Sequence, residues 1–103
     1  MFDLLITGGD ILDGTGAPAY RADLGVKDGR IAAIGTDLGQ AAETLDATGS
    51  VVAPGFIDIH THSDFVLLVD GRADSQVCQG VTLEVIGQCG FSCAPFTGRA
   101  QVT

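Results

Sequence analysis

Residues 56–62 alternate between two kinds of side chain, and no other segment limits the possible folds of this chain as strongly. The run reads Phe-Ile-Asp-Ile-His-Thr-His and follows Pro54-Gly55, where proline prevents ordinary strand pairing. Successive side chains of a strand point to opposite faces. One face is therefore β-branched and mainly apolar, and the other carries the phenylalanine, the aspartate and both histidines. We expect a strand with one packed face and one polar face.

The residues after this strand have the pattern of a crossover to a second strand. An apolar run is broken at Asp70-Gly71, and residues 73–79 predict two turns of helix with Gly80 as the C-cap. Residues 81–87 then predict a second strand. A strand, a crossover and a second strand form a βαβ unit, which we expect to be right-handed. In an α/β barrel, residues 88–95 would form a loop at the carboxyl end of the second strand, where such enzymes place their chemistry.

Residues 1–53 consist of short apolar runs separated by turn residues, which is the pattern of a small β domain. The clearest hairpin signal is residues 27–30, Lys-Asp-Gly-Arg, because Asp-Gly supplies the positive φ angles of a type I′ turn. The pair Gly8-Gly9 predicts a break between two strands. Residues 44–47 predict a further strand, and residues 51–53 a short one before the proline.

These patterns predict two domains. We expect a small β-sandwich over residues 1–54, and over residues 55–103 the first strand, crossover and second strand of a TIM-type (β/α)8 barrel that is incomplete in this chain. Two parallel strands cannot cover their apolar faces by themselves. We therefore expect residues 56–103 to be unstable or adhesive in isolation.

Composition and charge exclude several kinds of partner. Thirteen acidic residues against five basic ones give a formal net charge of -8, which disfavours nucleic acid and anionic membrane surfaces. The amino-terminal residues lack the pattern of a secretory signal, and no stretch has the apolar length of a membrane span. Three cysteines cannot all be paired, which favours a reducing compartment. We expect a cytoplasmic protein; the sequence does not predict its oligomeric state.

His60 and His62 are the two histidines of the chain, and they end the alternating strand. On one strand face their Cα atoms would lie roughly 7 Å apart, from the strand rise per residue. Two neutral imidazoles can then converge on one cation, and zinc favours such ligands. An isolated pair of this spacing is more often two surface histidines. Here the preceding turn and strand direct both rings to the same side, so we interpret the pair as metal ligands.

The cysteines and two acidic residues are further candidates. Cys89 follows the second strand where it can reach the histidines, and a thiolate suits zinc, but a free cysteine is more often a small buried thiol. Spacing alone leaves that choice open. For Cys78 and Cys93 we expect packing roles. Asp58 either orients an imidazole by accepting its second N–H or is a polar plug at the barrel's amino end, and Glu84 has no evident role.

Several motifs resemble one family of enzymes. Residues 55–64 read Gly-Phe-Ile-Asp-Ile-His-Thr-His-Ser-Asp, residues 79–82 read Gln-Gly-Val-Thr, and residues 87–92 read Gly-Gln-Cys-Gly-Phe-Ser. Together with the amino-terminal segments at residues 3–9 and 11–16, these motifs resemble the amidohydrolase superfamily, and within it the N-acyl-D-amino-acid deacylases, or D-aminoacylases. The resemblance spans nearly the whole of this chain but covers only the first part of the sequence of a typical family member.

The resemblance implies a zinc-dependent hydrolase. In D-aminoacylases the two histidines and the cysteine are zinc ligands, which implies that His60, His62 and Cys89 bind Zn²⁺ here. The implied reaction is deacylation of an N-acyl-D-amino acid to a carboxylate and a D-amino acid by a metal-activated water. The family also uses two later histidines and a late aspartate as general base, which we expect beyond residue 103. We therefore expect no catalytic base within this chain and no activity from the chain alone.

Two departures from the family pattern and two alternatives accompany this interpretation. Ser63 stands where an aspartate often follows the histidines, and Gln88 stands where asparagine is usual; both bear on substrate preference more than on the reaction class. One alternative is a cyclic-amide hydrolase, similar to dihydroorotases or hydantoinases. The other is a non-catalytic β module. The deacylase and the cyclic-amide hydrolase would be distinguished by the sequence downstream of this chain. The non-catalytic β module would be distinguished from both enzymes by metal binding.

Overall fold

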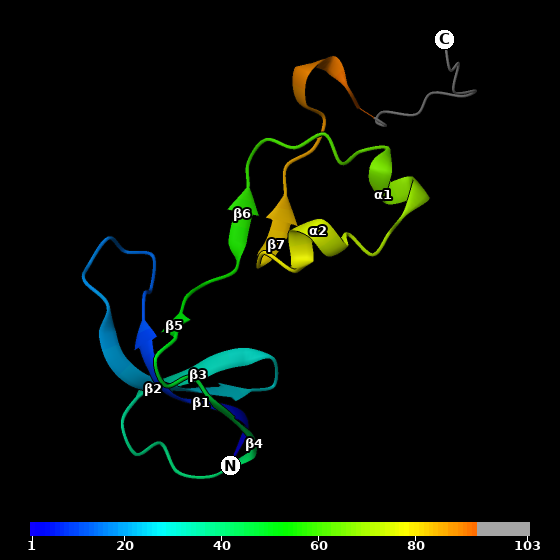
Figure 1. Cartoon of the computed structure of the whole chain (residues 1–103). Coiled ribbons are helices and arrows are strands. Elements are labelled where there is room, and N and C mark those ends of the chain that lie inside the picture. Colours follow the sequence, from blue (N-terminus) through cyan, green and yellow to red (C-terminus); the bar gives the residue numbers. More distant parts are fainter. Residues whose placement is uncertain (93–103) are drawn as a thin grey trace. The chain divides into compact units, whose positions relative to one another are not determined.

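The computed structural model of the chain describes residues 1–92 and contains two compact units, Met1–Pro54 and Gly55–Thr103 (Figure 1). Each unit has its own sheet. Cys93, for which we expected a packing role, lies outside the described residues. The two units are described separately below.

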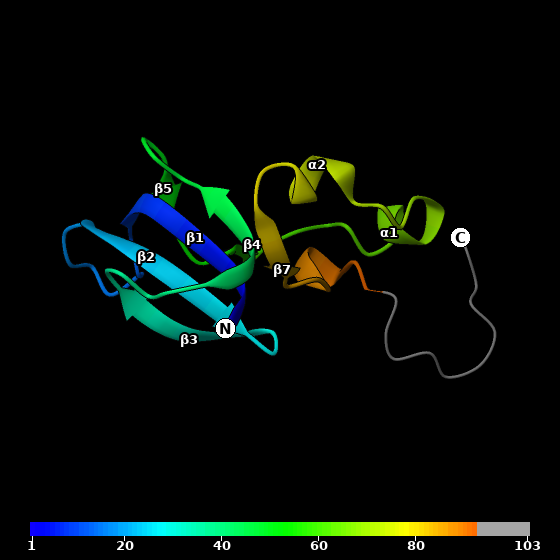
Figure 2. The same ribbon diagram turned by 90° about the horizontal axis from the view of Figure 1, so that it is seen from below.

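The first unit is a single mixed sheet of five strands in the order β3-β2-β1-β4, with β5 also pairing with β1 (Figure 2). The strands are β1 (Phe2–Ile11), β2 (Tyr20–Lys27), β3 (Arg30–Gly35), β4 (Ala41–Asp46) and β5 (Val51–Val52). β1 is antiparallel to β2 and parallel to β4 and β5. Among the described residues the expected β-sandwich is therefore corrected to one sheet. Short strands between turns do not themselves reveal whether they join one sheet or two.

β1 is continuous where the glycine pair predicted a break. Its pairing with β2 passes from Ile6 opposite Leu24 to Gly9 opposite Ala22, so the strand contains a β-bulge. Gly8 adopts a φ of 69°, and its N–H donates to Asp23 Oδ1 at 2.9 Å. A bulge inserts one extra residue and shifts the alternation of side chains. The glycines thus bend the strand instead of ending it.

The hydrophobic core cluster of this unit lies on one face of the sheet. The shifted alternation places apolar residues from both halves of β1 on that face, beside alternate residues of β2 and one residue of β5. The cluster consists of Ile11, Ala22 and Leu24, which are buried, with Ile6, Val26 and Val52 packed against them. The bulge therefore lets both halves of β1 contribute to one core cluster.

The hairpin between β2 and β3 confirms the sequence prediction. Lys27 pairs with Arg30, and the two turn residues Asp28 and Gly29 adopt φ angles of 50° and 70°. Asp3 braces this turn, because Lys27 Nζ lies 2.7 Å from its Oδ1 and the Asp28 N–H donates to its Oδ2 at 2.7 Å. The side-chain hydrogen bond from Lys27, and then the backbone hydrogen bond from Asp28, lower the pKa of Asp3.

The second unit contains two parallel strands, β6 (Phe56–Asp58) and β7 (Val81–Glu84), which lie side by side in Figure 1. Two single-turn helices, α1 (Val66–Val69) and α2 (Asp74–Val77), form the crossover. The strands and the second helix are shorter than predicted, and the two strands do not close a barrel. No helix among residues 1–92 has the length and apolar character needed to cross a membrane.

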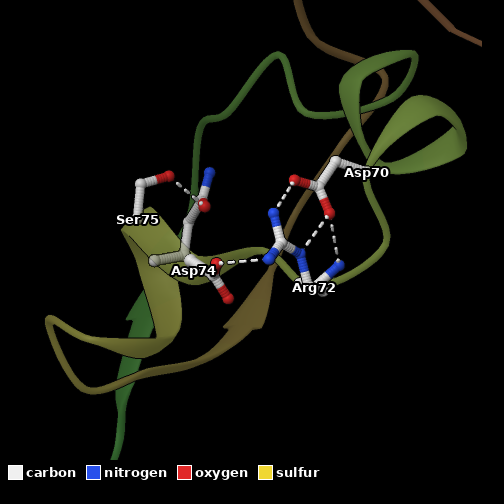
Figure 3. Close-up of polar contacts among 5 residues, drawn as sticks. Asp70, Arg72, Asp74 and Ser75 are labelled. Carbon is white, nitrogen blue, oxygen red and sulfur yellow. Dashed lines mark hydrogen bonds and ion pairs between the residues drawn. The ribbon is translucent and has the colours of Figure 1, made fainter.

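An ion-pair cluster links the two helices of the crossover (Figure 3). Arg72 places Nη2 2.8 Å from Asp70 Oδ2 and Nη1 3.5 Å from Asp74 Oδ2. The side-chain hydrogen bond from Arg72 lowers the pKa of Asp70. Arg72 precedes Ala73, which takes a left-handed φ of 50° at the start of α2. These side chains are exposed, so the cluster orders the turn locally and contributes little to overall stability.

Candidate metal centre

His60 and His62 lie just beyond the carboxyl end of β6. The strand ends earlier than predicted because Asp58 Oδ1 accepts the backbone N–H of His60 at 3.0 Å, which bends the chain. The prediction that both histidines stand on a regular strand is therefore wrong, yet their rings remain neighbours with centroids 5.5 Å apart. One of the two roles expected for Asp58 was to accept an imidazole N–H. In the structure its carboxylate instead accepts the backbone N–H of His60.

Cys89 joins the two histidines from the end of the neighbouring strand. Its Sγ lies 3.4 Å from His60 Nε2, and the ligand atoms of all three residues lie within 4.8 Å of one another. Bond lengths of about 2.1 Å for nitrogen and 2.3 Å for sulfur put tetrahedral zinc ligands roughly 3.3 to 3.7 Å apart. The spacing and the donor types both fit one zinc ion, after a side-chain adjustment of about 1 Å for the widest separation. All three side chains are exposed to solvent.

The β-ladder holds the two halves of this cluster together. The Val85 N–H donates to the Asp58 carbonyl at 2.8 Å, and the Thr61 N–H donates to the Val85 carbonyl at 3.3 Å. Parallel pairing thus continues past β6 and β7 toward the segments that carry the ligands. Because the carboxyl ends of parallel strands meet at one edge of a sheet, His60 and Cys89 come together although they are 29 residues apart in sequence.

The loop that carries Cys89 is conformationally unusual. Gly87 has a φ of 80° and Gly90 a φ of 82°, which glycine adopts without steric cost, but Cys89 also has a positive φ of 54°. A non-glycine residue in this region costs on the order of 1 to 3 kcal/mol, and such residues cluster at functional sites. Phe91 follows, with its ring edge-to-face against His62 at a centroid distance of 5.6 Å. The left-handed conformation of Cys89, like the spacing of the three side chains, is a feature that favours a functional role for this loop.

Ser63 and Asp64 are buried beside this loop, with only 5% and 4% of their surface exposed. The Ser63 hydroxyl contacts Thr61 Oγ1 at 2.7 Å. Asp64 accepts the backbone N–H of Gly87 at 3.0 Å through Oδ1 and 3.3 Å through Oδ2. Sequence reasoning assigned neither residue a structural role, because hydrophilic residues after a strand predict an exposed loop. The available signal was a carboxylate two positions beyond the histidine pair.

The remaining candidates lie outside the cluster. Cys78 is the C-cap residue of α2 and is an exposed free thiol, so the expectation of a small buried thiol is wrong for it. The short helix leaves its carboxyl end open to solvent. Glu84 pairs in register with Asp58, and its Oε1 is buried without a hydrogen-bond partner among the described residues.

Comparison with known proteins identifies the class to which this arrangement belongs. Residues 43–100 match the model of the amidohydrolase family. The chain belongs to the amidohydrolase family. It is 54% identical over 95 residues to a D-aminoacylase of Alcaligenes xylosoxydans xylosoxydans, a match that covers 91% of this chain and 20% of that protein.

A solved structure has the same fold in this region. An N-acyl-D-glutamate deacylase from Bordetella bronchiseptica, complexed with zinc and a phosphonate inhibitor, is similar with a TM-score of 0.85 and 53% identity over 91% of this chain and 20% of that one. A shorter match, 51% identical over 61 residues, relates 59% of this chain to 13% of an allantoinase of Escherichia coli O1:K1 / APEC. The chain spans about a fifth of the length of the deacylases that it matches.

Proposed function

We propose that this chain carries the first three metal ligands of a zinc-dependent amide hydrolase that converts N-acyl-D-amino acids to a carboxylate and a free D-amino acid. The observation that carries this proposal is the cluster of His60, His62 and Cys89, whose ligand atoms lie within 4.8 Å of one another. Two imidazoles and a thiol form a donor set that favours zinc over oxygen-seeking ions such as magnesium. The similarity to D-aminoacylase and N-acyl-D-glutamate deacylase supports the substrate class.

The proposal includes a place for this chain in a larger fold. Residues 1–54 would form a separate β domain, and residues 55–103 would be the first βαβ unit of a (β/α)8 barrel. The parallel pairing of β6 with β7 supports this interpretation, as does the position of the ligands beyond the carboxyl ends of both strands. Barrel enzymes bind their substrates at this end.

The roles of the chain's own residues follow from their chemistry. A bound zinc ion would polarise the acyl carbonyl and activate water for attack. His60 and His62 would bind as neutral imidazoles, and Cys89 as a thiolate. Phe91 would cover one side of the His62 ring, because the two rings already contact edge to face. The general base would lie outside residues 1–103, so we expect this chain alone to be inactive.

Cyclic amides are the second substrate class, and the extent of the matches favours the first. The D-aminoacylase match covers 91% of the chain, including most of the first unit, whereas the allantoinase match covers 59%. Release of free D-amino acid from N-acetyl-D-amino acids, compared with ring opening of a hydantoin, distinguishes the two classes in the product of the gene that encodes this chain. Ring opening without deacylation would contradict the proposed substrate class.

Zinc titration of the chain tests the proposed ligands. Isothermal titration should show one zinc ion bound per chain, and replacement of His60, His62 and Cys89 together should abolish binding. Cys78→Ser is a matched control, because it removes another exposed free thiol that lies outside the cluster. Undiminished zinc affinity in the triple variant would refute the proposed site.

A further inference from the structure

Asp64 is buried in a segment that is otherwise largely open to solvent. It lies two residues after His62 and exposes only 4% of its surface. Both of its carboxylate oxygens accept the same backbone N–H, that of Gly87, at 3.0 and 3.3 Å. Hydrogen bonds to a carboxylate are stronger than those between neutral groups. The carboxylate therefore fixes the chain firmly at residue 87, across 23 positions of sequence.

Gly87 is the residue from which the Cys89 loop begins. It precedes the 3-10 turn Gln88–Gly90, the orange turn in Figure 1, and has a left-handed φ of 80°. Cys89 follows with its own positive φ of 54° and brings its Sγ to 3.4 Å from His60 Nε2. A non-glycine residue leaves this conformation unless its surroundings hold it there. The direction of the loop, and with it the position of the thiol, depends on how residue 87 is held.

We propose that Asp64 is a positioning residue for the third metal ligand. By holding the Gly87 N–H, it keeps the loop in the conformation that aims the Cys89 thiol at His60. This inference rests on the proposed function, because it takes Cys89 as a ligand. It adds a residue outside the cluster of three proposed ligands, and this residue determines whether the site includes sulfur.

Cobalt(II) binding to the full chain tests this role, because a thiolate ligand gives a ligand-to-metal charge-transfer absorption that imidazole ligands alone do not give. Wild-type chain should show this band. Asp64→Ala should lose most of it and bind cobalt about 10- to 100-fold more weakly, the usual effect of removing a residue that orients a ligand. Asp64→Asn keeps the shape of the side chain and one carbonyl oxygen to accept the Gly87 N–H, so it should recover part of the band.

Ser63→Ala provides the matched control. It alters the adjacent residue, which is buried to the same degree but whose hydroxyl contacts Thr61 and Gln76. The control should retain the band. A second measurement needs no metal: exchange of the Gly87 amide proton, followed by NMR, should be faster in Asp64→Ala than in wild type, while amides of β1 exchange at unchanged rates.

The outcomes separate this inference from the proposed function. If Cys89→Ser retained the charge-transfer band, Cys89 would not be a ligand and the proposed function would fail with it. If Cys89→Ser lost the band but Asp64→Ala kept both the band and the affinity, the site would stand and the positioning role would be wrong. Equal losses in Ser63→Ala and Asp64→Ala would also overturn the positioning role. The positioning role would likewise be overturned if Asp64→Asn lost the charge-transfer band while its Gly87 amide proton remained protected from exchange.

Discussion

The Sγ of Cys89 lies 3.4 Å from Nε2 of His60, although 29 positions separate the two residues in sequence. The contact depends on two parallel strands that end at the same edge and on a cysteine in a left-handed conformation. The candidate site therefore combines an ordinary pair of parallel strands with a cysteine in a strained conformation. This combination leads to predictions that treat stability and metal binding separately.

Cys89→Gly should stabilise the metal-free chain while removing its affinity for zinc. Glycine adopts the φ of 54° found at this position without the clash that a side chain causes, a gain of roughly 1 kcal/mol. Thermal unfolding followed by circular dichroism measures the first effect, and zinc titration measures the second. Gln88→Gly is the control, because the φ of residue 88 is not positive and glycine there should destabilise the chain. A Cys89→Gly chain less stable than wild type would contradict the assignment of strain.

Gly9→Ala should destabilise the first unit by about 1 to 3 kcal/mol, the usual cost of overpacking a core. A Cβ at this position would lie 2.6 Å from Val52 Cγ2 and 3.1 Å from Ala47 Cβ. Urea unfolding measures the difference. At Gly35, also in the sheet, a Cβ would meet only Leu38 Cδ2 at an ordinary 3.5 Å, so Gly35→Ala should change stability much less. Equal effects of the two substitutions would show that Val52 does not pack against Gly9 as described.

The brace between Asp3 and the hairpin should make stability depend on pH in the acid range. Hydrogen bonds from Lys27 and the Asp28 amide lower the pKa of Asp3 below 3.8, so its ionised form is favoured by folding. This contribution is present above the unfolded pKa and disappears as the pH falls through the folded pKa. Asp3→Asn should therefore be less stable than wild type near neutral pH and should converge with it in strong acid.

The measurement for this brace is the free energy of unfolding as a function of pH at low salt, since salt screens an exposed pair. Asp37→Asn removes the same charge at another exposed position and is the control. Convergence with wild type should be specific to Asp3→Asn. A constant difference between Asp3→Asn and wild type from pH 7 to strong acid would contradict the brace.

The second unit should bind apolar dyes and self-associate. Several large apolar side chains of its strand end and crossover are exposed, among them Ile59 at 75%, Leu68 at 74% and Val69 at 90%. Replacing Leu68 and Val69 together by serine should lower both dye fluorescence and the apparent mass in light scattering, because it removes contiguous apolar surface. A monomeric wild-type chain that binds no dye would contradict this expectation.

Local sequence signals predicted the parts of the structure that depend on local chemistry. The turn at Asp28-Gly29 was predictable because those residue types favour positive φ. The strand at residues 56–58 followed from its alternating pattern. The bulge at Gly8 was not predictable from the glycine pair alone, because its register depends on Asp23 in the next strand. A glycine pair between apolar runs is compatible with either a turn or a bulge.

The candidate site could be predicted from the sequence as a set of residues, but its geometry could not. His60 and His62 followed from their spacing, while Cys89 required a resemblance, because the distance between two loops depends on how their strands pair. Asp64 was missed for a related reason. Its burial and its contact with Gly87 arise from the packing of segments that are 23 positions apart, which no local pattern records.

X-ray absorption of the zinc-loaded chain tests the central claim most directly, because the fine structure at the zinc edge distinguishes sulfur from nitrogen ligands. The account predicts one sulfur and two imidazole nitrogens in the ligand shell, supplied by Cys89, His60 and His62. The sulfur should persist in Cys78→Ser and disappear in Cys89→Ser. A zinc shell without sulfur in the wild-type chain, or one whose sulfur survives in Cys89→Ser, would contradict the proposed metal centre.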